Sequence, residues 1–268
     1  MMMKAFRRSL PVLFFLCALP LLGQNPLVGT WERVTDSVRS VKIITPTHWI
    51  VFIEAFQGDS STFEMAHGGT YTLKGNKYIE HISVASWADP KKAKTDFTYY
   101  EAADNTFLQK GTVTLGNGTV IPIDEVWQKV TDANMNPHFP AIGTWNRLSY
   151  ATVAADGKKK TYTNATATCF EIITPSHWMR ISHRNNKFER VSGGTYTTAG
   201  NKAFPKVEYA SSPMNKQEKI ETTQQVAGDK RYSSVLILGP DGKKITQVEE
   251  VLERVIAKPQ VAKTVVAR

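Results

Sequence analysis

With 268 residues, of which 41% are hydrophobic, the chain is long enough for one large or two small domains. Its formal charge of +9 is divided unevenly: residues 24–138 hold 10 Lys and Arg against 13 Asp and Glu, whereas residues 139–268 hold 20 against 11. The basic residues gather in turns without interleaved aromatic residues, which argues against a nucleic-acid partner. Only Cys169 follows the leader described next, so an intramolecular disulfide is excluded and this thiol is predicted to be a small core residue.

Residues 1–23 have the pattern of a secretory signal peptide. Three basic residues precede an apolar run, Leu10–Leu22, and Gly23 offers a small residue for cleavage. This run is too short for a comfortable membrane span, and no other stretch is long and apolar enough. We therefore expect a secreted or periplasmic protein that is not an integral membrane protein, with a retained N-terminal anchor as the alternative.

The remaining sequence contains two copies of one unit. Ile-Ile-Thr-Pro-Thr-His-Trp at 43–49 returns at 172–178 with Ser in place of the second Thr, and Gly-Thr-Trp at 29–31 returns at 143–145. The offset between the copies grows from 114 to 129 residues between these two motifs, which indicates an insertion of fifteen residues around 155–158. Because the two copies have opposite net charges and a stiff proline-containing connection, we expect them to pack against each other. The predicted divisions are a first copy at 24–136, a proline-containing linker at 137–142, a second copy at 143–256 and a disordered basic tail at 257–268.

Each copy is a series of short β-branched and aromatic runs separated by Gly, Asn, Asp and Pro, which is typical of an all-β fold. Eight strands in simple succession fit an antiparallel up-and-down barrel, which removes exposed edges by closing. A two-sheet sandwich is the alternative, and a short helical turn is expected within 86–94. The strands predicted in the first copy are 29–35, 39–45, 48–56, 63–73, 77–84, 95–101, 105–115 and 119–130.

These motifs resemble a known family. Gly-Thr-Trp on the first strand, the Thr-Pro-Thr-His-Trp phrase, Gly-Gly-Thr-Tyr and a closing Glu125-Val-Trp-Gln-Lys are similar to the lipocalin-like (calycin) domains of uncharacterised secreted bacterial proteins, Bacteroidetes among them. The resemblance implies two tandem eight-stranded barrels, each with a cavity for a small hydrophobic molecule. It also implies that Trp31 and Trp145 close one end of their barrels. Leu252 stands where the first copy has Trp127, so that end of the second barrel departs from the pattern.

The strand after the shared phrase carries the predicted site. Alternation places His48, Ile50 and Phe52 on one face and Trp49, Val51 and Ile53 on the other. In the second copy the Trp178 face also holds Arg180 and Ser182, so this polar face is predicted to lie outside and the histidine face inside. An inward histidine could contact a ligand, act as an acid–base group or have a structural role only. The predicted ligand-binding residues of the second copy are His177, Met179 and Ile181.

Two carboxylates could accompany the histidines. Glu80 and Glu208 occupy comparable strands, and Glu80 could form a carboxylate–imidazole pair with His48 or a buried structural pair. Glu125 and Glu250 are predicted to face solvent. The sequence has no phosphate loop, no nucleophile elbow and no recurring metal-ligand spacing, so neither a cofactor nor a metal is expected.

The leading hypothesis is a protein that binds a small, largely apolar molecule, with the histidines at the mouth of the barrel. One alternative is an envelope interaction module with filled barrels, suggested by an apolar outward face of Trp49, Val51 and Ile53. Another is a hydrolase or isomerase that uses His48 or His177 with a carboxylate, although a non-enzyme is favoured.

Overall fold

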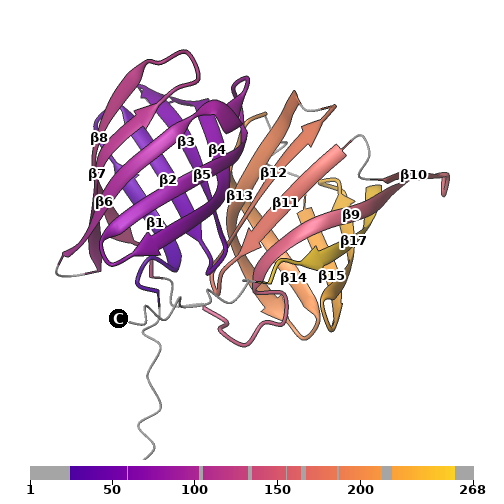
Figure 1. Ribbon diagram of the computed structural model, residues 1–268. Coiled ribbons are helices and arrows are strands. Elements are labelled where there is room, and N and C mark those ends of the chain that lie inside the picture. Colours follow the sequence, from indigo (N-terminus) through magenta and orange to yellow (C-terminus); the bar gives the residue numbers. More distant parts are fainter. Residues whose placement is uncertain are drawn as a thin grey trace, which may run out of the picture.

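The computed structural model describes residues 25–58, 60–102, 105–131, 135–154, 156–163, 167–185, 187–212 and 219–256. The predicted signal peptide and basic tail therefore lie outside the described residues. The rest forms two antiparallel β-barrels that lie side by side, one from each copy of the repeat, as the sequence predicted (Figure 1). Two eight-stranded barrels of this kind fit a lipocalin-like fold.

Barrel 1 is a closed ring in which each strand pairs with the next along the chain and β1 pairs with β8. The predicted strands are confirmed, with ends that differ by at most three residues. The short turn expected within 86–94 is the 3-10 helix η1 (Pro90–Lys92). The strands are β1 (Gly29–Val34), β2 (Val38–Ile44), β3 (His48–Gln57), β4 (Ser60–Lys74), β5 (Lys77–Ala85), β6 (Lys94–Ala102), β7 (Thr106–Thr114) and β8 (Val120–Lys129).

Barrel 2 repeats this ring and adds one strand. The insertion predicted near residue 155 forms β10, which pairs with the distal half of β9, while β17 pairs with β9 over most of its length and closes the ring. The strands are β9 (Gly143–Ala154), β10 (Lys159–Thr163), β11 (Ala167–Ile173), β12 (His177–Arg184), β13 (Lys187–Ala199), β14 (Lys202–Ala210), β15 (Lys219–Ala227), β16 (Lys230–Leu238) and β17 (Lys244–Arg254).

The tryptophan of each Gly-Thr-Trp motif is buried where the ring closes. The indole N–H of Trp31 donates to the carbonyl of Leu27 at 2.8 Å, and that of Trp145 donates to the carbonyl of Ala141 at 2.7 Å. Each indole thereby fixes the segment that precedes the first strand of its own barrel. A basic side chain from the closing strand covers each indole, with Lys129 Nζ 5.4 Å from the Trp31 ring and Arg254 Cζ 4.2 Å from the Trp145 ring.

The interior of barrel 1 is packed with aromatic side chains around one ion pair. Lys42 Nζ contacts Glu80 Oε1 and Gln109 Oε1, both at 2.9 Å, and the Tyr78 hydroxyl donates to Glu80 at 2.8 Å. The Lys42 ammonium also lies 4.7 Å from the centre of the Trp127 ring. The buried apolar residues are Leu27, Trp31, Ile44, Trp49, Val51, Tyr78, Ile82, Ala85, Phe97, Tyr99, Phe107 and Trp127.

The two barrels meet through equivalent surfaces. Thr30 of the first copy contacts Thr174 of the second at 3.1 Å between hydroxyl oxygens, and the reciprocal pair, Thr144 and Thr45, is 2.6 Å apart. Phe63 and Phe188, which occupy the same place in the two copies, stack on each other with ring centroids 5.8 Å apart. The contact is thus self-complementary, like the interface of a two-fold symmetric dimer. The repeated Thr-Pro phrase lies within it.

Candidate functional site

Strand pairing places residues of the two copies in equivalent positions and shows how their interiors differ. In barrel 1 Tyr78 pairs with Phe97, whereas the equivalent pair in barrel 2 is Ala203 with Thr222. Likewise, the pair Phe107–Trp127 of barrel 1 becomes Arg231–Leu252. Small or charged side chains therefore stand in barrel 2 where barrel 1 has aromatic rings.

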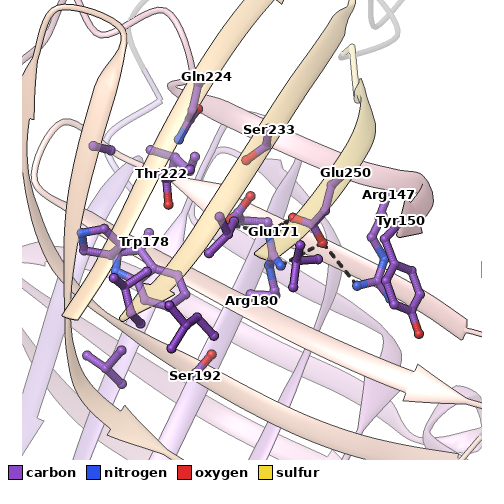
Figure 2. A pocket seen from close by; sticks show the side chains of 18 of the residues that line it. Arg147, Tyr150, Glu171, Trp178, Arg180, Ser192, Thr222, Gln224, Ser233 and Glu250 are labelled. Atoms are coloured by element: carbon purple, nitrogen blue, oxygen red, sulfur yellow. Dashed lines mark hydrogen bonds and ion pairs between the residues drawn. The ribbon is translucent and has the colours of Figure 1, made fainter. Parts of the chain in front are cut away.

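A cavity of about 420 Å³ occupies the interior of barrel 2 (Figure 2). This volume lies within the range of small-molecule sites, and barrels of about eight strands can hold one small ligand. Phe139 from the segment before β9 is buried and lines the cavity together with Tyr196 and Ala203. Apolar residues predominate along the β14 to β17 side: Ala203, Pro205, Val207, Ile220, Val235, Ile237 and Val248.

A chain of five charged side chains crosses the cavity wall. Arg180 from β12 is central: its two terminal nitrogens contact Glu250 Oε1 at 3.0 Å and Oε2 at 2.7 Å, and Nη2 is 3.3 Å from Glu171 Oε1. Arg231 forms an ion pair with Glu171 from one end, and Arg147 contacts Glu250 at 3.3 Å from the other. Figure 2 shows Arg180 and Arg147 converging on Glu250. The order of charges is positive, negative, positive, negative, positive.

These contacts keep the buried carboxylates ionised. Burial acts to raise the pKa of Glu171, but the adjacent guanidinium groups of Arg180 and Arg231 outweigh it and lower the pKa to about 2. The pKa of Glu250 is also lowered, because Arg180 outweighs the effect of its burial. The pKa of Arg180 is raised well above its ordinary value because it contacts both carboxylates despite its burial. Glu171, Arg180 and Glu250 thus remain charged near neutral pH.

Several hydrogen-bond donors in this wall have no partner among the described residues. They include Nε and Nη1 of Arg231, whose side chain is 1% exposed, and the indole Nε1 of Trp178. In barrel 1 the indole equivalent to Trp178 is that of Trp49, and it donates to the carbonyl of Thr70 at 3.1 Å. Because a buried donor without a partner carries a desolvation cost, these atoms indicate a wall prepared for hydrogen-bond acceptors.

The inward orientation predicted for the histidine face is wrong in both copies. His48, Ile50 and Phe52 point out of barrel 1 and pack against barrel 2, where His48 lies beside Phe170 with ring centroids 5.6 Å apart. Met179 and Ile181 point out of barrel 2 into the same apolar cluster. The opposite faces, Trp49 with Val51 and Trp178 with Arg180, point into the barrels. The outward apolar patch of Trp49, Val51 and Ile53 expected for an interaction module is therefore absent from the described surface.

The structure separates the predicted histidine–carboxylate pair. Glu80 lies inside barrel 1 beside Lys42, while His48 lies on the outer side of the wall. Burial lowers the pKa of His48 to about 4. A catalytic pair of His48 and Glu80 is thus contradicted, and with it the geometric basis of the enzyme alternative in the first copy.

His177 and Glu208 share a groove between the barrels. This groove measures about 310 Å³, and Arg39 and Tyr209 also line it. Glu208 accepts a hydrogen bond from the Thr195 hydroxyl at 3.0 Å, and His177 Nδ1 lies 2.7 Å from the Ser176 hydroxyl oxygen. Glu208 is not the counterpart of Glu80, since Pro205 opposite Tyr196 takes the place of Glu80 opposite Tyr71. The predicted site residues therefore lie in two separate places: Glu80 is inside barrel 1, and the others are at the contact between the barrels.

The sequence patterns did not identify the charged residues of the cavity. They placed Arg180 and Glu250 on the solvent-facing side of their strands, and the structure places both inside barrel 2. Arg180 was assigned to solvent because polar faces are usually exposed. Glu250 was also expected in solvent, but residues two apart on a strand share a face, so Glu250 follows the fully buried Leu252 into the barrel. The same rule applies to Glu125, which accepts a hydrogen bond from the buried Trp127 indole at 3.1 Å. The signal that could have found the site is the change of Phe107 in the first copy to Arg231 in the second.

Other features of the described residues are simpler. Cys169 is a buried free thiol, and burial raises its pKa, in keeping with a core role. No group of three or more His, Cys, Asp and Glu residues in the described ranges is placed to hold a metal ion. None of the helical segments in those ranges has the length and hydropathy required to cross a membrane.

Comparisons with known proteins give no family assignment. No family model matches the chain, and no curated protein matches it. One similar solved structure is a protein of unknown function of the DUF3598 family from Nostoc punctiforme, with a TM-score of 0.28 and 11% identity over 86% of this chain and 97% of that one. Two others are the DNA polymerase sliding clamp of Pseudomonas aeruginosa and the DNA polymerase III beta chain of Streptococcus pneumoniae. That of Pseudomonas aeruginosa has a TM-score of 0.15 and 6% identity over 88% and 79% of the two chains, and the beta chain of Streptococcus pneumoniae has 0.14 and 9% over 86% and 58%. Such low similarity carries no inference about function.

Proposed function

We propose that this protein binds a small, largely apolar molecule in the interior of barrel 2, and that barrel 1 is its filled structural partner. The observation that carries the proposal is the cavity of about 420 Å³ at the place where barrel 1 has packed aromatic rings. A cavity of this size, lined by apolar side chains together with convergent polar and charged groups, can hold a small ligand. The predicted histidines are not part of this proposal.

The test is to fill the cavity with the side chains of barrel 1. The neutral fluorescent probe N-phenyl-1-naphthylamine becomes bright when it enters an apolar cavity, so we expect saturable binding to the wild-type protein. The double variant Ala203→Phe, Thr222→Phe places two rings at the positions of Tyr78 and Phe97 and should abolish saturable binding. Phenylalanine is preferred to tyrosine at position 203. In barrel 1 the Tyr78 hydroxyl donates to Glu80, but barrel 2 has Pro205 at the position of Glu80, so a tyrosine hydroxyl would lack this acceptor.

Thr223→Phe is the matched control. Thr223 is the neighbour of Thr222 on β15 and lies on the other face of the wall, outside the cavity of barrel 2. It adds the same bulk to the same strand, so probe binding should persist. Saturable binding that survives in the double variant, or that is lost equally in Thr223→Phe, would place the site elsewhere.

We also propose that the protein acts outside the cytoplasm and belongs with lipocalin-like domains of secreted bacterial proteins. The support is the basic and apolar pattern of residues 1–23 and the repeated motifs of the two barrels. Mass spectrometry of the protein recovered from a bacterial host should detect a chain that lacks these residues. Recovery of the intact N-terminus from the membrane fraction would instead support a retained anchor.

A further inference from the structure

The charged chain of barrel 2 is one negative charge short of neutrality. Three arginines, 147, 180 and 231, alternate with two glutamates, 171 and 250, and a cation stands at each end. All five groups are buried or nearly so. Because an uncompensated buried charge is costly, a further anion in contact with either end would stabilise the arrangement.

The Arg231 end has the greater need of an anion. Its guanidinium uses Nη2 to reach Glu171, while Nε and Nη1 have no partner among the described residues. The group also lies 4.9 Å from the Trp145 ring, and Arg254 covers that ring at 4.2 Å. Two cations therefore share one indole. Nε or Nη1 could donate a charge-assisted hydrogen bond to an incoming carboxylate, which is stronger than a neutral one.

The surroundings of the cavity favour an anion that carries an apolar body. Five arginines and three glutamates line the cavity, so its wall has a positive balance. Beyond the charged chain the lining includes a set of aliphatic residues on four successive strands, interspersed with polar ones such as Thr222 and Thr246. The aliphatic residues are Val207, Ile220, Val235, Ile237 and Val248. A small inorganic anion would leave this aliphatic surface in contact with water. An extended apolar chain would cover it.

Barrel 1 shows that the positive balance is specific to the second copy. Lys42 and Glu80 form a neutral pair, with the amide oxygen of Gln109 as a further acceptor for the ammonium. Phe107 stands at the position of Arg231 and Val51 at that of Arg180. Glu125 also turns into barrel 1 and adds negative charge there. Among the described residues, the excess of positive charge thus occurs only in the barrel with the cavity.

We propose that the ligand of barrel 2 is an amphiphilic organic anion whose carboxylate binds Arg231 and whose apolar body covers the aliphatic wall of β14 to β17. This inference rests on the binding function proposed above and names the ligand class of the same cavity. Fatty-acid-sized monocarboxylates are the simplest molecules of this class.

The first experiment compares an acid with its neutral isostere on the wild-type protein. Decanoate and decanamide have the same chain and nearly the same head size, and each is titrated against bound N-phenyl-1-naphthylamine at constant ionic strength. We expect decanoate to displace the probe at a concentration about ten- to a hundredfold lower than decanamide. The reason is that only the carboxylate can form a charge-assisted hydrogen bond with the guanidinium in which both partners are ionised. Acetate, which lacks the apolar body, should displace little.

Each result bears on a different claim. Equal affinities for acid and amide would overturn the anionic head group while leaving the binding function in place. Displacement by acetate as effective as by decanoate would overturn the apolar body and assign the site to a small anion. Absence of saturable probe binding to the wild type would overturn the binding function and this inference together.

The second experiment locates the head group. Arg231→Met keeps an unbranched apolar stem and removes the charged guanidinium, so decanoate affinity should fall by about ten- to a hundredfold while decanamide affinity changes less than about threefold. Lys206→Met is the matched control, since Lys206 lies on β14 outside the cavity lining and its side chain is 76% exposed, and it should leave both affinities nearly unchanged. Retained probe binding by Arg231→Met shows that the variant is folded. Equal losses in the two variants would overturn the assignment to Arg231.

Discussion

The two barrels have one frame and opposite interiors. Barrel 1 surrounds the ion pair of Lys42 and Glu80 with rings such as Tyr78 and Trp127. Barrel 2 has Ala203 and Leu252 at the places of these two rings, and a cavity with excess positive charge. Several residues that face the other barrel, in contrast, are repeated in the second copy, among them Thr30, Thr45 and Phe63 as Thr144, Thr174 and Phe188. A self-complementary interface requires the same residues on both sides, so repeated residues mark the contact. Inward residues that differ mark the candidate site.

The largest effect should come from removing the centre of the charged chain. Arg180→Met leaves Glu250 with only Arg147 and Glu171 with only Arg231, and the loss of one partner from a buried ion pair costs about 3–5 kcal/mol of the free energy of unfolding. Hydrogen exchange resolved by peptide should assign the loss to barrel 2 and leave barrel 1 protected.

Arg190→Met serves as the control for this measurement, because its exposed side chain should contribute less than about 0.5 kcal/mol. Equal protection of barrel 2 in wild type and Arg180→Met would mean that the charged chain contributes nothing to stability.

A second variant tests whether barrel 1 depends on its packed rings. Trp127→Leu installs the residue that barrel 2 has at this position and should lower the free energy of unfolding by about 2–3 kcal/mol, as expected when a large buried side chain is shortened. Tyr100→Ala, at a side chain that is 48% exposed on β6, should change it by less than about 0.5 kcal/mol. Urea denaturation measures both.

If Trp127→Leu unfolds at the urea concentration of the wild type, the interior of barrel 1 tolerates a void. Barrel 1 would then be a second candidate for ligand binding, and the contrast between the copies would be weaker than we infer.

The smallest expected effect, counted per pH unit, is a difference between the two barrels in how acid lowers their stability. In barrel 1, burial and the charge of Lys42 lower the pKa of His67 to about 3, below its unfolded value of 6.5. Its contribution is complete above pH 6.5 and is lost as the pH falls toward 3, by at most about 1.4 kcal/mol per pH unit. In barrel 2, the pKa of Glu171 is lowered to about 2, so its contribution is lost only between pH 4.5 and 2.

Acidification from pH 7 to 5 should therefore weaken barrel 1 before barrel 2. Protection factors corrected for intrinsic exchange rates measure the two barrels separately, and His67→Phe isolates the histidine. The variant should show a smaller loss of barrel 1 protection between pH 7 and 5 than the wild type. An equal loss in both proteins would assign the acid sensitivity to other groups.

The sequence by itself determined the all-β class, the two copies and, to within three residues, the strand boundaries of the first copy. Turn residues and short alternating runs are local signals, and local signals suffice for these features. The insertion near residue 155 could likewise be located from the change in offset between motifs, although its folding as β10 could not.

Only the tertiary structure decided which face of each strand lies inside. The strands β2, β3, β11 and β12 are covered on both faces, by their own barrel and by the neighbouring one. Alternation of polar and apolar residues identifies the inner face only when the other face meets water. Here the apolar face of β12 fills the contact between barrels, and its polar face turns inward because Glu171 and Glu250 from other strands neutralise Arg180.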